Sequence, residues 1–148
     1  MAARLEAGND RRLRSRNRLA TLVAARNETL SLYSDLARQR PFTTDPATEH
    51  ALRHFCEALI DYTAGAHFQL YRFVAEGRER RQSVQGVADR VYPRIAEITD
   101  RILEFNDRYD TAPLEACLPT LADDLSRLGE DLADRIQLED QLIDAMTR

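Results

Sequence analysis

Two charged residues interrupt an apolar helical seam near the end of the chain. The apolar positions of that seam step by three or four residues and are Leu118, Leu121, Leu125, Leu128 and Leu132. This spacing keeps one face of a helix turned toward a core. The next two positions on the face are Arg135 and Glu139, and then Leu142 and Met146 resume it. Because buried charges are stable only when paired and hydrogen-bonded, the seam predicts an ion pair with further polar partners.

The candidate partners lie in one stretch in the middle of the chain, "EALIDYTAGAHFQLY". On a helix this stretch places Asp61, Tyr62, His67 and Tyr71 near the inward face. Gly65 lies among them, and a glycine in mid-helix costs about 1 kcal/mol relative to alanine, so we expect close packing or function to keep it. Two interpretations are open at this point: a structural network that fixes helix register, and a polar cavity used for recognition.

The motifs of common enzyme and metal sites are missing from the sequence. It has no glycine-rich phosphate loop, no Cys-x-x-Cys pair and no lysine among its 21 basic residues. A di-iron bundle needs Glu-x-x-His twice, whereas this chain has the reverse order, His54-x-x-Glu57, and three histidines. Cys56 and Cys117 are expected to be small buried groups. We therefore predict a protein that is not an enzyme, with no catalytic residue, no cofactor and no metal.

Four long amphipathic helices joined by short breaks account for the periodicity. Asn9 or Asp10 is expected to cap the first helix, and Asp45 followed by Pro46 is expected to start the second. No stretch alternates with the period of two that is typical of strands. The first predicted helix runs from Asn9 or Asp10 to about Leu36. The others run from Pro46 to near Gly77, from about Val87 to Tyr109, and from Leu114 to Met146.

The pattern as a whole predicts an all-α fold, an antiparallel four-helix bundle with long helices and short joints. It is expected to be a single domain over residues 1–148, in which residues 1–10 form a flexible N-terminal arm. The side chains expected to face the core are Leu19, Leu22, Val23, Leu30, Tyr33 and Leu36 on the first helix, Leu52, Phe55, Leu59, Tyr62, Ala66, Leu70 and Phe73 on the second, and Val91, Ile95, Ile98, Ile102 and Phe105 on the third.

Charge and hydropathy narrow the class of partner. The formal net charge is -4 and the pI is about 5.4, which argues against a general nucleic-acid binder because such proteins carry a basic surface. No apolar run approaches the roughly 20 residues of a membrane-spanning helix, so we expect a cytoplasmic protein. An arginine run at positions 4–18 opens the chain, and we expect a solvated helix end there.

Three segments resemble the Rsd/AlgQ family of bacterial anti-sigma factors. They are "RNETLSLYSDL" (26–36), "HFCEALIDYTAGAHFQLYRFV" (54–74) and "ADRIQLEDQLI" (133–143), in the family's order and spacing. The phrase Phe-Cys-x-x-Leu-x-Asp-Tyr is far more specific than a leucine ladder. The chain departs from the family pattern at Leu22, where a tryptophan is expected.

The resemblance implies a protein that binds the primary sigma factor of RNA polymerase through its C-terminal promoter-reading domain and so regulates transcription in stationary phase. It also implies links to the phosphocarrier HPr and to alarmone metabolism, with no direct binding of nucleic acid or membrane. The residues carried over to partner binding or the polar interior are Tyr33, Asp61, Tyr62, His67, Tyr71, Arg135, Glu139 and Asp140. We expect an interface with an apolar centre on the first two helices and an acidic rim. Asp123 and Asp124 either belong to this rim or are merely solvated.

Other interpretations stay open on sequence grounds. One is a non-catalytic adaptor bundle regulated by HPr or linked to alarmone metabolism, and the weakest is a metal-binding four-helix protein. The oligomeric state, monomer or weak dimer, is not fixed by any pattern in the chain.

Overall fold

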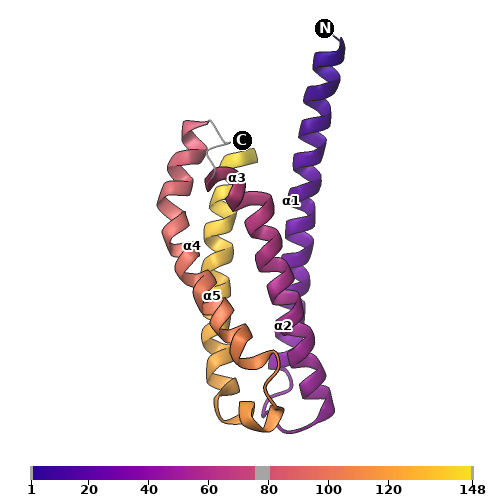
Figure 1. Ribbon diagram of the computed structural model, residues 1–148, viewed down its shortest axis with the longest axis vertical. Coiled ribbons are helices and arrows are strands. Elements are labelled where there is room, and N and C mark those ends of the chain that lie inside the picture. The colour runs from indigo at the N-terminus through magenta and orange to yellow at the C-terminus, as the bar shows by residue number, and fades with distance from the viewer. Residues whose placement is uncertain (1, 76–80, 148) are drawn as a thin grey trace.

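Four antiparallel helical rods make up the protein, as the computed structural model shows for residues 2–75 and 81–147 (Figure 1). The elements are α1 (Ala2–Ala37), α2 (Pro46–Ala66), the π-helix η1 (His67–Tyr71), α3 (Arg72–Ala75), α4 (Gln82–Tyr109) and α5 (Leu114–Thr147). Because α2, η1 and α3 follow one another without a break, they form one rod. α1 packs mainly against α2, and α4 mainly against α5. The predicted all-α four-helix bundle is confirmed.

The start of α2 is set by local chemistry that is visible in the sequence. Asp45 has an extended backbone, and its side chain accepts a hydrogen bond from the backbone N–H of Ala47 at 2.9 Å. Pro46 occupies the first turn, where its missing N–H removes no helical hydrogen bond. The predicted cap of the second helix is therefore confirmed.

The predicted start of the first helix is wrong. α1 already begins at Ala2, so Asn9 and Asp10 lie inside the helix and do not cap it. Its N-terminal part extends beyond the ends of the other helices (Figure 1). A flexible arm over residues 1–10 stays a prediction. The side chains of the arginine run up to position 16 lie outside the described residues.

α4 also begins earlier than the predicted Val87. Its first residue is Gln82, because burial of Val84 and Ala88 outweighs the cost of placing Gly86 in a helix. The part of the second joint at residues 76–80 lies outside the described residues. Pro93 lies inside α4 and Pro119 lies inside α5, and neither proline interrupts its helix.

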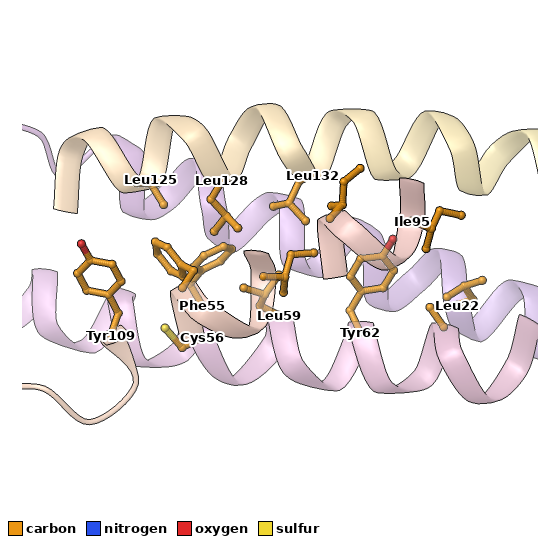
Figure 2. Packing of buried hydrophobic residues seen from close by; sticks show 14 of the residues in the cluster. Leu22, Phe55, Cys56, Leu59, Tyr62, Ile95, Tyr109, Leu125, Leu128 and Leu132 are labelled. Carbon is orange, nitrogen blue, oxygen red and sulfur yellow. The ribbon is translucent and has the colours of Figure 1, made fainter. Parts of the chain in front are cut away.

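An apolar core follows the predicted seams through most of the bundle (Figure 2). The seam leucines 121, 125, 128 and 132 are at most 3% exposed. Leu125, Leu128 and Leu132 face Phe55 and Leu59 of α2 (Figure 2). All five predicted inward positions of α4 are buried. Cys56 and Cys117 are buried, unbridged thiols, as predicted. Leu22, at the position where a tryptophan was expected, is itself buried in this core.

The inward positions of the first helix were predicted less well. Leu22 and Leu36 are buried, but Leu30 is 36% exposed and Thr29 takes the inward place. The Thr29 hydroxyl donates to the backbone carbonyl of Ala25 at 2.8 Å, which satisfies its polar group inside the bundle. A threonine at a core position was overlooked because a hydropathy pattern counts it as polar.

The loop between α4 and α5 is anchored to α2 by one arginine. The Arg53 guanidinium donates to the backbone carbonyls of Tyr109 and Ala112. The first of these carbonyls lies in the last turn of α4, where helical partners run out. The Tyr109 hydroxyl in turn bonds Thr120 and Asp124 at the start of α5. Asp124 is therefore held by the fold and is not merely solvated, and its place in an acidic rim stays a prediction.

α1 contacts α5 at the point where the side chain of Tyr33 packs against Gly129. The Tyr33 hydroxyl donates to the backbone carbonyl of Leu125 at 2.9 Å, and its ring stands edge-on to Phe55 with centroids 5.7 Å apart. A Cβ on Gly129 would lie 2.8 Å from Cζ of Tyr33 and closer still to its hydroxyl oxygen. Gly129 is therefore needed for this contact. Gly65 is different, since a Cβ there meets nothing within 4 Å, and the expected close packing at Gly65 is wrong.

These two glycines provide a matched pair of substitutions. Gly129→Ala should lower the free energy of unfolding by about 1–3 kcal/mol, because Tyr33 must move out of a packed site. Gly65→Ala should raise it by up to about 1 kcal/mol, because alanine favours the helix and has open space. Urea unfolding of both variants measures the difference. Equal effects of the two substitutions would contradict the close approach of α1 to α5.

Candidate functional site

The predicted interior ion pair exists, and one carboxylate lies at its centre. Glu139 is 0% exposed. The Tyr62 hydroxyl donates to this carboxylate, 2.8 Å from each of its oxygens, and the Tyr71 hydroxyl donates to Oε2 at 2.7 Å. Two hydroxyl donors from the α2–η1 rod thus meet a charge from α5. Hydrogen bonds to a charged acceptor are the strong ones, and here they replace the water that the carboxylate has lost.

Arg135 lies one turn earlier on α5 and is 1% exposed. Its Nε is 3.9 Å from Oε2 of Glu139, and its Nη1 donates to Oγ1 of Thr63 at 3.3 Å. The guanidinium carbon lies 5.2 Å from the ring centroid of Tyr62 and 5.6 Å from that of Tyr71. The cation is therefore held by two aromatic faces, in addition to the one hydrogen bond that it makes to the described residues.

A third charged residue of the network, Arg26 of α1, was overlooked in the sequence. Its Nη1 donates to Oδ1 of Asp140 at 2.7 Å and to Oε1 of Glu139 at 3.5 Å. The signal was present, because Arg26 lies seven residues before Tyr33 and so on the same face of α1. With Arg26 included, the network joins α1, the α2–η1 rod and α5.

The π-helix explains how Tyr71 reaches the network. The backbone N–H of Arg72 bonds the carbonyl of His67, five residues back, which adds one residue to this turn. As a result Leu70 and Tyr71 are both turned inward, at 0% and 1% exposure. After Leu70, the spacing of three or four residues predicts that Phe73 faces the core. The side chain of Phe73 lies outside the described residues. The buried position that follows is Val74.

Two residues that were predicted to belong to the buried polar network, Asp61 and His67, lie on the surface. Asp61 and His67 are exposed, so the expectation that they pair with Arg135 or Glu139 is wrong. Each lies beside inward residues in the sequence, and the rotation of 100° per residue turns them away from the core. Asp140 is also outside, with a side chain 54% exposed, but it belongs to the network through Arg26. Tyr33 is half-buried against Gly129. Partner binding by these residues stays a prediction.

Asp61 instead lines a shallow groove between α1 and α2. The groove measures about 170 Å³ and is lined by Ala25, Glu28, His54, Glu57, Ala58 and Asp61. Three carboxylates and one histidine thus gather on the outer face of these two helices. Within the part of the chain that the structure describes, no group of three or more histidine, cysteine or acidic residues is arranged to hold a metal ion. An acidic face of this kind is suited to attracting a basic partner.

The interior network should respond very differently to single and double substitution. Glu139→Leu leaves the buried Arg135 guanidinium and two tyrosine hydroxyls without their carboxylate partner. Breaking one side of a buried pair typically lowers the free energy of unfolding by about 3–5 kcal/mol. Replacing both Arg135 and Glu139 by leucine should cost much less. Glu97→Leu, which removes an exposed ion pair with Arg94, is the control and should change stability by less than about 1 kcal/mol. If the double variant is as unstable as the sum of the single variants, the pair is not coupled.

High pH should unfold the protein through its tyrosines. Burial, aided by the Glu139 carboxylate, raises the pKa values of Tyr62 and Tyr71 above the ordinary 10.0, and burial with a bond to Asp124 raises that of Tyr109 to about 12. The unfolded chain therefore loses protons that the folded chain keeps. The contribution of these tyrosines to the free energy of unfolding should be fully present below pH 10 and should decrease as the pH rises above 10.

Tyrosinate absorbance measures this linkage. In the folded protein the signal of the three buried tyrosines should appear only together with loss of helix, whereas in denaturant all five tyrosines should titrate near 10. In the double variant Tyr62→Phe and Tyr71→Phe, the free energy of unfolding should decrease less steeply as the pH rises above 10. A complete titration near pH 10 with the helices intact would show that the hydroxyls are not held by the fold.

Known proteins resemble this chain over most of its length. The family model "Regulator of RNA polymerase sigma(70) subunit, Rsd/AlgQ" matches residues 1–147. A protein of Yersinia enterocolitica named "Regulator of sigma D" is 32% identical over 148 residues, which cover 97% of this chain and 88% of the relative. A Yersinia pseudotuberculosis protein of that name is 30% identical over 148 residues, 97% of this chain and 87% of the relative.

A third relative, "Regulator of sigma D" of Salmonella paratyphi B, is 34% identical over 100 residues, which cover 64% of this chain and 59% of the relative. No solved structure gave a significant match. The segments that carry the interior network, on α1, the α2–η1 rod and α5, all lie within the matched range. Since the match extends over nearly the whole sequence, the chain belongs to the Rsd/AlgQ family of regulators of the sigma(70) subunit of RNA polymerase.

Proposed function

We propose that this protein is an anti-sigma factor, which binds the primary sigma factor through its C-terminal promoter-reading domain and keeps it from core RNA polymerase. The family match over residues 1–147 is the observation that carries this proposal. The names of the Yersinia relatives, which describe regulators of sigma D, support it. Sequestration needs no chemical step: sigma held in this complex is unavailable to core enzyme, by mass action.

Binding without turnover agrees with the character of the site. The charges of the interior network are paired with one another, and the tyrosine pKa values are raised, so these hydroxyls stay protonated near neutral pH. We propose that the protein is not an enzyme. Among the helices of residues 2–75 and 81–147, none combines the length and the hydropathy of a membrane-spanning segment. Because RNA polymerase works in the bacterial cytoplasm, the proposed role places the protein there. HPr as a second partner stays a prediction.

The acidic groove between α1 and α2 is the surface we assign to the sigma factor. A domain that reads a promoter must present basic residues to the phosphate backbone of DNA. Glu28, Glu57 and Asp61 offer the complementary charge on one face. A protein that covers the basic surface of the domain would also keep it from promoter DNA. Asp61 further belongs to the segment that resembles the family.

The large apolar centre expected on the first two helices has little support. Of the large apolar side chains described there, only Leu30 and Phe68 are exposed, at 36% and 65%. Tyr33, which was expected to anchor the partner, is half-buried against Gly129 and supports the fold. The proposed recognition therefore relies more on charge than the sequence suggested, and electrostatic complementarity acts mainly on the rate of encounter.

Charge reversal tests this assignment with a matched control. Asp61→Arg should slow association with the intact primary sigma factor by about threefold or more at low salt, because a like charge now faces the basic partner. Asp123→Arg is the same change at an exposed position of α5 outside the groove. We take Asp123 to be merely solvated, so this change should leave the rate unchanged. Surface plasmon resonance at two ionic strengths measures both rates. Raised salt should slow association more than it speeds dissociation.

Two results would count against the proposal in different ways. If Asp61→Arg and Asp123→Arg have the same effect, the sigma factor binds elsewhere on the bundle. If the unmodified protein shows no saturable binding to the primary sigma factor, and the factor does not co-purify with it, the anti-sigma function itself is wrong.

A further inference from the structure

A second groove, between the α2–η1 rod and α4, has a different chemistry from the acidic one. It measures about 380 Å³, which is within the range of small-molecule sites. Its walls are mainly apolar and aromatic and include Ile60, Phe68, Tyr71, Tyr92, Ile95 and Leu103. Phe68 is 65% exposed and Leu103 is 43% exposed, so apolar surface is open to solvent beside the hollow. Such surface favours a ligand with an apolar body.

The same groove reaches a buried cation with spare donors. Arg135 lines it, although the residue is only 1% exposed. A guanidinium carries five N–H donors, and the one hydrogen bond that this group makes to the described residues runs from Nη1 to Thr63. Its Nε has no hydrogen-bond partner among them and lies 3.9 Å from Glu139. Donors therefore remain for an acceptor that enters from the groove.

The charge balance of the interior favours an anion at this place. Glu139 is shared between two guanidiniums, those of Arg26 and Arg135. The second carboxylate of the network, Asp140, pairs with Arg26 from the outside, with a side chain 54% exposed. The least exposed charged groups of the network, Arg26, Arg135 and Glu139, thus hold two positive charges and one negative charge. Asp100 also lines the groove, but it is exposed and its charge is screened by solvent.

We propose that this groove binds a small carboxylate with an apolar or aromatic body. The carboxylate accepts hydrogen bonds from the Arg135 guanidinium, and the body lies between Phe68 and Leu103. The rings of Tyr62 and Tyr71 fix the guanidinium before the ligand arrives, which lowers the cost of ordering it. A single guanidinium in an apolar wall suits a monoanion better than a phosphate dianion. The proposal is independent of sigma binding.

The test uses the intact chain and 4-phenylbutyrate as the probe. Isothermal titration calorimetry should show saturable binding to one site at millimolar probe. Backbone amide shifts should concentrate in residues 60–71 and 92–103, the segments that line the groove. The neutral 4-phenylbutyramide and acetate, which lack the charge and the apolar body respectively, should each bind about tenfold more weakly or worse.

Substitution at the groove wall avoids disturbing Arg135, whose loss would strand Glu139. Ala96→Phe fills the hollow from α4 and should weaken 4-phenylbutyrate binding by about tenfold or more. Ala122→Phe introduces the same side chain at an exposed alanine of α5 outside the groove and should leave binding unchanged. Circular dichroism should show both variants to be as helical as the parent.

Three outcomes would overturn the proposal. They are no saturable binding of 4-phenylbutyrate at millimolar concentration, equal binding of the butyrate and the butyramide, and binding that Ala96→Phe does not weaken. If the sigma factor shifts the groove amides while 4-phenylbutyrate does not, the groove is a protein-docking surface and the proposal is wrong.

Discussion

The burial of the Glu139 carboxylate is the constraint on which the rest of this bundle depends. A carboxylate taken fully out of water is tolerated only when donors replace the solvent. Here two tyrosine hydroxyls of α2–η1 and the Arg26 guanidinium of α1 donate hydrogen bonds, and Arg135 of α5 adds an opposite charge 3.9 Å away. Leucine seams alone tolerate sliding, because one leucine replaces another. A single carboxylate with directional partners permits one register.

Several local features are understood as consequences of that register. The extra residue of the π-helix turns Tyr71 inward beside Leu70, so that a second hydroxyl reaches the carboxylate. At the other end of the bundle, Arg53 fixes the last turn of α4. Between them, Tyr33 bonds the backbone of α5 across Gly129. Each of these contacts joins helices that the sequence keeps far apart, and together they specify one arrangement of the bundle.

The two surfaces that we propose for binding are the grooves that border the α2–η1 rod. The groove toward α1 is acidic, and the groove toward α4 is apolar with a buried guanidinium at its wall. Two surfaces of such different chemistry are suited to different ligands, a basic protein domain and a small apolar carboxylate. Both proposed uses are binding, and neither needs a bond to be broken. The proposed use of the acidic groove agrees with membership of a family of regulators of the sigma(70) subunit.

The sequence by itself determined the helical class, the cap at Asp45, the leucine seam and the presence of Arg135 and Glu139 inside it, because each of these follows from local chemistry or from a period of 3.6 residues. Only the tertiary structure decided which side chains meet that pair. Asp61 and His67 were expected there and are exposed, whereas Arg26 was not expected and is present. Periodicity fixes the direction of a side chain to within a helical face, but the relative rotation and register of separate helices depend on contacts between residues distant in sequence, such as the 113 positions that separate Arg26 from Glu139.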